Sequence, residues 1–395
     1  MMHRRIAVFT GNRAEYGLLF PVLKAISIHP ALDYRLVVAG AHLDPNFGRT
    51  VAEIEADGFV VHAQAAINLD GDTLLATAKA IGSGICLVAD MLARLEPDLF
   101  VVYADRFEGF SALIAATQMG IPTAHIEGGD VTEGGALDDS VRHAMTKLAH
   151  LHFTTNADAA RRIRAMGEES WRVHNVGFPA IDLIKAGVFA PSQEIQARFG
   201  LDPSRPLVVF TQHSVTTEFD QAGEQVQPAL EAMARLVKEG VQVVATYSNN
   251  DAGGRRIIAR LEQFAARHSE SVVLRRSVGR HDYHGLLNLC GRVGRGVCVG
   301  NSSSGIKETP AFGCPTVDIG TRQQGRLAAE NVLHVGYDSR EIETAIRRGL
   351  FDESFRDKCA SCENPYGEGN AGPRIAEVLS NIPLDRRLLV KRMTI

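Results

Sequence analysis

The sequence predicts an α/β protein built from two doubly wound domains, and three observations support this prediction. Short β-branched runs alternate with amphipathic helical stretches along the chain. This alternation is typical of parallel sheets, because parallel strands need helical crossovers between them. The pattern pauses after Gly177-Phe178-Pro179 and restarts after Pro206. The length of 395 residues also suits two domains of about 100–200 residues each.

Each half of the chain contains five predicted strands. In the first half they cover residues 6–9, 36–39, 99–103, 123–126 and 151–154, and in the second half 207–210, 241–246, 272–274, 293–299 and 316–319. A last helix is predicted over residues 371–379. We therefore expect one domain at residues 1–180, a second at 181–368, and a C-terminal helix and tail over 369–395. Ligands of such sheets bind beyond the carboxyl ends of the strands.

Composition excludes several functional classes. Forty-two basic and 46 acidic side chains give a net charge of −4 without a long block of like charge, so neither nucleic acid nor a membrane surface is an expected partner. The chain has no uninterrupted apolar run of about 18 residues. Its six cysteines are scattered, and the Cys359–Cys362 spacing has no second pair at zinc-ribbon distance. A cytoplasmic protein with reduced thiols and no metal centre is expected.

A glycine-bearing turn, Gly11-Asn12-Arg13, follows the first predicted strand and opens a helix. Such a turn exposes unpaired N–H groups at the positive end of the helix dipole, so an anion can bind there with Arg13 adding charge. The turn has no GxGxxG pattern, and the chain has no GxxxxGK[ST] pattern. An ordinary strand-to-helix turn explains this segment equally well.

Acidic residues follow two successive strands of the first half. Asp105-Arg106-Phe107-Glu108 comes after one strand, and Glu127-Gly128-Gly129-Asp130 comes after the next. Paired carboxylates in a partly dry crevice tend to separate in pKa, which provides a base and an acid at neutral pH. Each acid alone is also explained as a helix cap. Asp138-Asp139 begins a further helix, where one of the two is expected to cap and the other to stay available.

The second half offers hydroxyls and a histidine at the same kind of position. Asn301-Ser302-Ser303-Ser304-Gly305 follows a predicted strand, and three hydroxyls at a helix start suit a diphosphate. Glu308 lies about one turn further, where a carboxylate can accept hydrogen bonds from ribose hydroxyls; a simple N-cap explains only part of this segment. His213 follows the first strand of this half. His281 and His284 have metal-ligand spacing, but a surface helix is favoured there.

Together these blocks resemble the hydrolysing UDP-N-acetylglucosamine 2-epimerases. The resemblance runs in matching order to about residue 380 and rests on residues 11–16, 105–108, 125–129, 138–143, 212–213, 249–253, 300–305 and 320–323. It implies a GT-B-like architecture: two Rossmann-like domains around a central cleft, with the C-terminal helix crossing back to the first domain. It also implies conversion of UDP-N-acetylglucosamine and water to N-acetylmannosamine and UDP for nonulosonic (sialic-type) acid synthesis.

The resemblance assigns expected roles to individual residues. The acid–base groups would be Asp105, Glu127 and Asp138, with His213 assisting departure of the diphosphate. Nucleotide and substrate binding would fall to Arg13, Arg106, Asn249, Val278, Ser302, Ser303, Ser304, Glu308 and Arg322. The expected ligands are a UDP-sugar substrate and the UDP product, without a metal or other cofactor, in a homodimer or homotetramer.

The chemistry accounts for these residue types. C2–H of the sugar is not acidic, so inversion needs a base beside it while UDP leaves C1, and positive groups must take up the charge that develops on the diphosphate. The chain departs from the family pattern at Ala104, where glycine is usual, and at Tyr103, which replaces a common histidine. Four alternatives stay open. Two are epimerases: a hydrolysing epimerase of UDP-2,4-diacetamido-2,4,6-trideoxyglucose or of a GDP-linked sugar, and an epimerase that makes UDP-N-acetylmannosamine without hydrolysis. The others are a GT-B glycosyltransferase and a non-catalytic nucleotide-sugar sensor.

Overall fold

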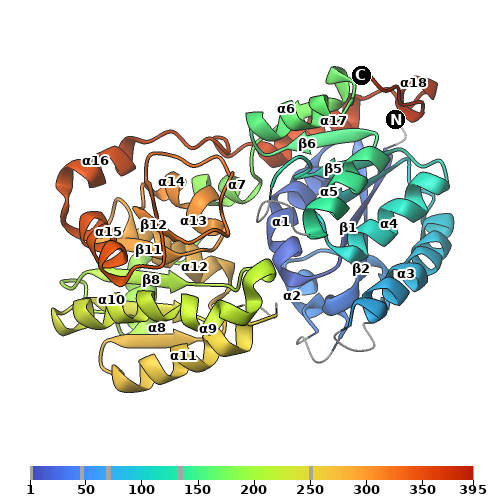
Figure 1. The fold of residues 1–395 in the computed structure, drawn as a ribbon. Coiled ribbons are helices and arrows are strands. Elements are labelled where there is room, and N and C mark those ends of the chain that lie inside the picture. Colours follow the sequence, from blue (N-terminus) through green and yellow to red (C-terminus); the bar gives the residue numbers. More distant parts are fainter. Residues whose placement is uncertain (1–2, 45–48, 68–72, 132–136, 249–251, 395) are drawn as a thin grey trace. The chain divides into compact units, whose positions relative to one another are not determined.

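The computed structural model describes residues 3–44, 49–67, 73–131, 137–248 and 252–394. The chain divides into two compact units (Figure 1). Unit 1 comprises Met1–Asp130, Leu137–Asp182 and Gly369–Ile395, and unit 2 comprises Val131–Ala136 and Leu183–Glu368.

In unit 1 the described residues form a seven-stranded parallel sheet in the order β3-β2-β1-β4-β5-β6-β7. Its strands are β1 (Arg4–Thr10), β2 (Leu32–Ala39), β3 (Val61–Ala65), β4 (Leu99–Tyr103), β5 (Thr123–Ile126), β6 (Leu151–Thr154) and β7 (Val173–Asn175). Its helices are α1 (Arg13–Ile28), α2 (Val51–Ala56), α3 (Leu74–Leu95), α4 (Phe107–Gln118), α5 (Leu137–Leu148), α6 (Ala157–Ala165), α17 (Ala371–Asn381) and α18 (Arg386–Leu389). Helix α7 (Ala180–Lys185) spans the boundary with unit 2.

Both faces of this sheet are covered, as the nearly continuous apolar run of β4 shows. Alternate strand residues point to opposite faces. Leu99, Val101 and Tyr103 belong to the core beneath α1 and α17, whereas Phe100 and Val102 belong to the core beneath α3 and α4. A strand buried on both sides needs apolar residues at every position, which is why β4 reads so clearly in the sequence.

The C-terminal segment completes unit 1. Helix α17, drawn in red, packs against α1 (Figure 1). The carboxylate of Asp182, at the point where the chain leaves unit 1, accepts hydrogen bonds from the backbone N–H groups of Ala371 at 2.9 Å and Gly372 at 2.7 Å. Further on, the buried guanidinium of Arg172 donates to the carbonyl of Leu388 at 2.7 Å, and Lys391 donates to the carbonyl of Ala149 at 2.6 Å.

In unit 2 the described residues form a six-stranded parallel sheet in the order β10-β9-β8-β11-β12-β13. The strands are β8 (Leu207–Thr211), β9 (Gln242–Thr246), β10 (Val272–Arg275), β11 (Gly296–Gly300), β12 (Thr316–Ile319) and β13 (Val332–Val335). The helices are α8 (Ser192–Phe199), α9 (Ala222–Gln225), α10 (Gln227–Lys238), α11 (Gly254–Arg267), α12 (Gly279–Cys290), α13 (Ser304–Lys307), α14 (Thr309–Phe312), α15 (Ser339–Phe351) and α16 (Glu353–Ser361).

Both sheets have the Rossmann strand order 3-2-1-4-5-6, which unit 1 extends by one strand. The expected α/β fold with two Rossmann-like domains is therefore confirmed. The sequence reading missed β3, β7 and β13. It also started the strand before Asn301 too early, because Val293 is an exposed loop residue and the strand begins at Gly296.

Helix α3 is long and apolar enough to cross a membrane by length and composition. Its window Leu75–Leu95 has a mean hydropathy of 1.5, and a third of that window is buried. Lys79 and Asp90 interrupt the apolar residues of this window. The helix packs against α4 and β3, and Val88 and Leu92 enter the core of unit 1. A core helix of a soluble domain passes the same test, so the window is weak evidence for a membrane span.

Candidate functional site

In each unit, the loops where the strand order reverses carry part of the predicted site, and the loops after neighbouring strands carry the rest. In unit 1 the loops at the reversal follow β1 and β4, and in unit 2 they follow β8 and β11. Helices diverge to opposite faces at such a switch point, which leaves the loops accessible to a ligand. The two loop clusters are described separately below.

The loop after β1 is capped by its own side chains. The Asn12 carboxamide oxygen accepts from the backbone N–H of Glu15 at 3.0 Å, while the Glu15 carboxylate accepts from the backbone N–H of Gly11 at 3.3 Å. These bonds resemble a capping box, with the carboxylate bound one residue before the N-cap Asn12, so two of the N–H groups considered for an anion are already used. Arg13 is half-exposed, and its guanidinium is paired with Glu53 at 3.0 Å.

A buried arginine lies at the centre of the acidic residues of unit 1. Arg142, on α5, forms ion pairs with Asp105, after β4, and with Asp139 at 2.7 Å. It also donates to the backbone carbonyl of Asp130 at 3.1 Å. Burial opposes its charge, but the carboxylates of Asp105, Asp130, Glu127 and Asp139 outweigh that effect and raise the pKa of Arg142. The cluster thus joins the loops after β4 and β5 to helix α5 through one permanent positive charge.

Arg142 was not among the predicted site residues. Its i,i+3 spacing from Asp139 was visible in the sequence, but its burial was not, since a helix pattern does not show which charged side chain faces inward. Of the doubled acid at the start of α5, Asp139 is buried and pairs with Arg142, whereas Asp138 is exposed.

The segment after β5 has an unusual backbone that explains its residues. Glu127 has φ +66° and Gly129 has φ +74°, and a side chain on Gly129 would collide with the carbonyl oxygen of Ala159 at 2.5 Å. Glu127 is buried, and its neighbour Tyr103 has a pKa well above the usual value, because of burial and then the charge of Glu127. Tyr103 therefore presents a neutral hydroxyl beside this carboxylate.

A second pair of acids lies beside the first group. Glu15 and Glu108 are both buried. Burial, followed by the charge of Glu108, raises the pKa of Glu15 well above its usual range, and burial also raises the pKa of Glu108. The Glu108 carboxylate is 3.5 Å from Arg106. Burial lowers the pKa of Arg106, but the charges of Glu108, Glu15, Asp138 and Asp105 outweigh it and raise that pKa.

In unit 2, Asn301 holds the loop that carries His213. The Asn301 carboxamide accepts from the backbone N–H of His213 at 2.7 Å and donates to its carbonyl at 2.8 Å. The carbonyl of Asn301 in turn accepts from Arg322 at 3.2 Å and from Gln323 at 2.7 Å. Burial, with a smaller contribution from the charge of Arg322, lowers the pKa of His213 to about 3. The histidine is therefore neutral at physiological pH in this state.

The serine segment after β11 matches its prediction in part. Ser302, Ser303 and Ser304 are partly buried, but α13 is a single turn that α14 follows almost at once, so it contributes little helix dipole. Ser304 donates to Glu308 at 2.6 Å. Glu308 is the cap between the two turns rather than a residue inside one helix.

A surface helix was expected around His281 and His284. The helix is present as α12, but the side that carries His284 is buried, so the expectation is wrong for this residue. His284 is almost fully buried, and its Nε2 is 3.1 Å from the Glu308 carboxylate. Burial acts to raise the pKa of Glu308, but the His284 hydrogen bond and charge and the Ser304 hydrogen bond outweigh it, so that pKa is lowered. Glu308 is therefore held as an oriented carboxylate. Val278 is the N-cap of α12, and Asn249 lies outside the described residues.

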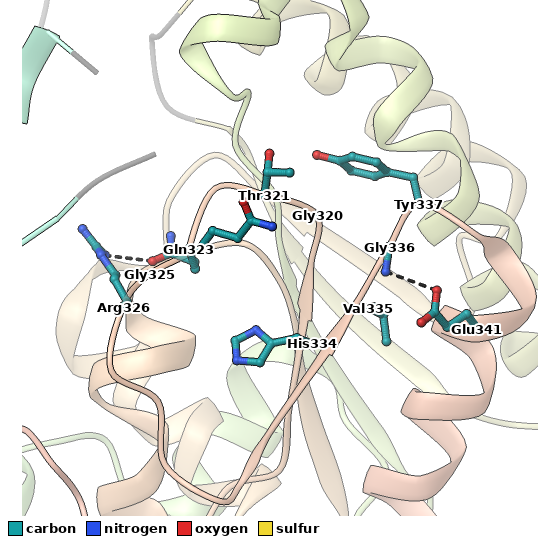
Figure 2. Close-up of a pocket in the computed structure, with 11 residues that line it drawn as sticks. Gly320, Thr321, Gln323, Gly325, Arg326, His334, Val335, Gly336, Tyr337 and Glu341 are labelled. Atoms are coloured by element: carbon teal, nitrogen blue, oxygen red, sulfur yellow. Dashed lines mark hydrogen bonds between the residues drawn. The ribbon is translucent and has the colours of Figure 1, made fainter. Parts of the chain in front are cut away.

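A pocket of about 450 Å³ lies at the carboxyl end of β12 and β13 in unit 2. Figure 2 shows side chains from the loop after β12, among them Gln323 and Arg326, together with His334 of β13 and Tyr337 beyond it. The pKa of His334 is raised by its hydrogen bond to Asp318. The loop that carries Arg322, which the sequence analysis singled out, forms one side of this pocket, whereas the residues from His334 onward were not predicted.

Comparison with known proteins covers nearly the whole chain. A sequence model of the family described as UDP-N-acetylglucosamine 2-epimerase matches residues 24–380. The UDP-N,N'-diacetylbacillosamine 2-epimerase (hydrolyzing) of Legionella pneumophila is 31% identical over 390 residues, which is 99% of each chain. The UDP-N-acetylglucosamine 2-epimerase of Neisseria meningitidis is 29% identical over 381 residues, or 96% of this chain and 95% of that one.

A solved structure shares the fold. The crystal structure of the Neisseria meningitidis UDP-GlcNAc 2-epimerase bound to UDP-GlcNAc superposes with a TM-score of 0.79 at 19% identity, covering 95% of this chain and 99% of that one. With two Rossmann-type sheets, the acid–arginine cluster at one switch point and a family match along nearly its full length, this chain belongs to the UDP-N-acetylglucosamine 2-epimerase family.

Proposed function

We propose that the protein is a hydrolysing nucleotide-sugar 2-epimerase that converts UDP-N-acetylglucosamine and water to N-acetylmannosamine and UDP. The observation that carries this proposal is the convergence of Asp105, Asp139 and Glu127 on Arg142 at the switch point of unit 1. A nucleotide-sugar binding protein or a glycosyltransferase needs no base at C2 of the sugar, so either function leaves this set of acids unexplained. A reaction that removes one proton from carbon and returns another accounts for them.

In the proposed reaction, a carboxylate of unit 1 removes the proton from C2 of the sugar while the bond from C1 to the diphosphate oxygen breaks. The electron pair of the C2–H bond forms a C1=C2 double bond, and UDP departs. Water then adds its hydroxyl to C1, and an acid delivers a proton to C2 from the opposite face. The acid–base groups are drawn from Asp105, Glu127 and Asp138, each contributing about 10²–10⁴ in rate.

Arg142 suits this chemistry because it is a permanent positive charge among several acids, which raise its pKa. Its ion pairs with Asp105 and Asp139 hold these two side chains in place. The Tyr103 hydroxyl beside Glu127 remains neutral, because its pKa is raised well above the usual value.

Unit 2 would bind the nucleotide in this proposal. Arg322 provides a permanent charge for the diphosphate, and the hydroxyls of Ser302 and Ser303 provide neutral donors. The Glu308 carboxylate, oriented by His284 and Ser304, suits the two ribose hydroxyls. His213 is neutral without ligand, so its ring N–H would assist departure of the diphosphate as a neutral hydrogen-bond donor.

The proposal is tested by incubating the protein with UDP-N-acetylglucosamine in D₂O and no acceptor. We expect free UDP and N-acetylmannosamine with deuterium at C2. Released UDP with an unlabelled sugar would indicate simple hydrolysis. UDP-linked mannosamine would indicate the non-hydrolysing reaction.

Glu127→Gln separates the enzyme from a nucleotide-sugar sensor. The variant keeps the size of the side chain and removes its basicity, so we expect turnover to fall about 10²–10⁴-fold while UDP binding persists. Glu96→Gln, on an exposed residue of the same unit, is the control and should retain full turnover. A Glu127→Gln protein with unchanged turnover would contradict the acid–base role.

A second substrate is supported by one observation. The Legionella pneumophila relative, 31% identical over the full length, is named for UDP-N,N'-diacetylbacillosamine, a 2,4-diacetamido-2,4,6-trideoxy sugar that would undergo the same elimination and hydration. Parallel assays with this sugar, UDP-N-acetylglucosamine and a GDP-linked counterpart rank the three by kcat/KM. A higher value for the diacetamido sugar would assign the protein to legionaminic-type acid synthesis instead.

A further inference from the structure

Two residues with left-handed backbone frame the acidic cluster of unit 1. Among the described residues, Ala104 at φ +54° and Glu127 at φ +66° are two of four non-glycine residues with positive φ. Ala104 immediately precedes Asp105. This region of φ is unfavourable for alanine because its Cβ approaches the following carbonyl oxygen, and strained residues of this kind persist only where the surroundings hold them.

The surroundings hold Ala104 through both of its backbone polar groups. Its N–H donates to the carbonyl of Ile126 at 2.9 Å, extending the β4–β5 pairing. Its carbonyl oxygen lies 2.6 Å from Nε2 of His125. That carbonyl belongs to the peptide bond between Ala104 and Asp105, so the histidine fixes the plane from which the Asp105 side chain departs.

His125 is built into the sheet for this contact. It is fully buried on β5, opposite Val102 of β4, and its Nδ1 is 3.4 Å from the hydroxyl of Thr146. A Cβ on Gly128 would lie 2.9 Å from that same nitrogen, so glycine is required there for the ring to fit. The ring therefore has one orientation, and its Nε2 faces Ala104.

The protonation state agrees with this geometry. Burial lowers the pKa of His125 to about 3, with smaller contributions from His152, Arg142 and Lys391, so the ring is neutral. A carbonyl oxygen only accepts, so the single ring hydrogen must be on Nε2. Near neutral pH, His125 is thus a neutral donor to the carbonyl of Ala104.

We propose that His125 is a positioning residue, whose Nε2–H holds Ala104 in its left-handed conformation and thereby places the Asp105 carboxylate against Arg142. This inference rests on the proposed function, in which Asp105 is an acid–base group. The competing explanation is that His125 only fills space in the core. The two differ in whether glycine at position 104, which adopts positive φ without cost, relieves the loss of the histidine.

The test uses four variants, with kcat, KM, UDP affinity and melting temperature measured for each. His125→Leu removes the donor, His125→Gln keeps a donor at the same reach, Ala104→Gly removes the strain, and the fourth combines His125→Leu with Ala104→Gly. His152→Leu is the control, because His152 is equally buried and pairs with His125 in register on β6 but bonds to Glu168 instead.

We expect His125→Leu to lower kcat about 10- to 100-fold with UDP affinity unchanged, since small misplacements of reacting groups have effects of that size. His125→Gln should keep most of the activity. Ala104→Gly should restore at least part of kcat to His125→Leu and none to His152→Leu. If the effects of His125→Leu and Ala104→Gly on kcat simply multiply, or if His125→Gln is as impaired as His125→Leu, the positioning role is refuted.

A crystal structure keeps the test independent of the proposed function. In His125→Leu, or in His125→Phe if the leucine variant does not fold, φ of Ala104 should move to negative values and the Asp105–Arg142 contact should lengthen, whereas His125→Gln should keep both. Unchanged φ at residue 104 refutes the inference even if the enzyme is active. If the unmodified protein turns over no nucleotide sugar, the proposed function fails, while φ of Ala104 still decides the role of His125.

Discussion

The switch point of unit 1 carries acids and permanently charged arginines, whereas that of unit 2 carries hydroxyls, a carboxamide and a neutral histidine. In unit 1, Arg142 binds two carboxylates and the backbone carbonyl of Asp130 directly. In unit 2, Asn301 holds His213 through backbone bonds, and Arg322 provides the permanent charge. The same strand order thus carries two different kinds of site. The site side chains of unit 1 are mostly charged without a ligand, whereas most of those of unit 2 are neutral.

Lowering the pH should destabilise unit 1 more than unit 2, and this is the largest effect we expect. Several buried histidines of unit 1 have pKa values below the usual 6.5, mainly because of burial: about 3 for His125 and about 4 for His42, His150 and His152. Between about pH 6.5 and pH 4 the unfolded chain therefore binds more protons than the folded chain, so stability falls as pH decreases through this window. In unit 2, the lowered pKa of His213 also reduces stability in acid, but the raised pKa of His334 has the opposite effect.

Trp171, the single tryptophan, lies in unit 1 and reports on that unit alone. We expect its fluorescence transition to occur at higher pH than the loss of far-UV circular dichroism, which reports both units. Glu15 and Glu108 have raised pKa values and act in the opposite direction, but they are fewer than the histidines. Coincident transitions by both probes would contradict the difference between the units.

Removal of the central arginine should have the next largest effect. Arg142→Met leaves buried carboxylates without their counter-charge, so we expect a loss of about 3–5 kcal/mol of unfolding free energy, together with loss of turnover. Urea denaturation and the UDP-release assay measure the two. The control is Arg161→Met, whose Asp158–Arg161 pair has the same i,i+3 spacing but is exposed. That change should stay within about 0.5 kcal/mol of the unmodified protein. Equal losses would show that the cluster is no more than a surface ion pair.

Asn301→Ala tests the design of unit 2. The change leaves the backbone N–H and carbonyl of His213 without their partner, so we expect UDP binding to weaken about tenfold or more. Calorimetric titration with UDP measures this. Asn331→Ala is the matched control, because Asn331 is equally buried but bonds to Thr309 and Cys314. It should destabilise the unit without changing UDP affinity. Unchanged affinity in Asn301→Ala would remove this residue from the site.

The smallest effect is expected at the second acid pair. Because the pKa of Glu15 is raised well above its usual range, glutamine resembles its protonated form, and Glu15→Gln should change stability at pH 7 by less than about 0.5 kcal/mol. Glu108→Gln removes the acid nearest to Arg106 and should cost more. Melting temperatures at pH 7 compare the two variants. A larger loss for Glu15→Gln would mean that Glu15 is ionised.

The sequence predicts the central strands of both sheets because burial on two faces makes them apolar throughout. β4 and β5 have the predicted boundaries. The missed strands β3, β7 and β13 are edge strands of partly exposed residues, such as His62 and Gln64, and their pairing depends on a neighbour that the sequence does not identify. Asp105 and Glu127 were predictable because they directly follow buried strands.

Other parts of the site could not be predicted, because they depend on which polar side chains face inward. Arg142 and His284 both lie on helices with mixed polar surfaces, and only the tertiary structure shows that each is buried against a carboxylate. The left-handed conformation of Ala104 is also invisible in a sequence, since alanine gives no signal for it. The candidate site therefore depends on a few backbone angles and buried charges that the sequence does not show.

The return of the chain to unit 1 has a consequence for biosynthesis. Ile375, Leu379 and Leu388 belong to the same core as β1 and β4, and Asp182 holds the start of α17. A ribosome therefore makes the whole of unit 2 before it delivers the last pieces of unit 1. Unit 1 is thus translated first but completed last. Until α17 is made, the nascent chain exposes the apolar surface that this helix covers, and a chaperone can bind there.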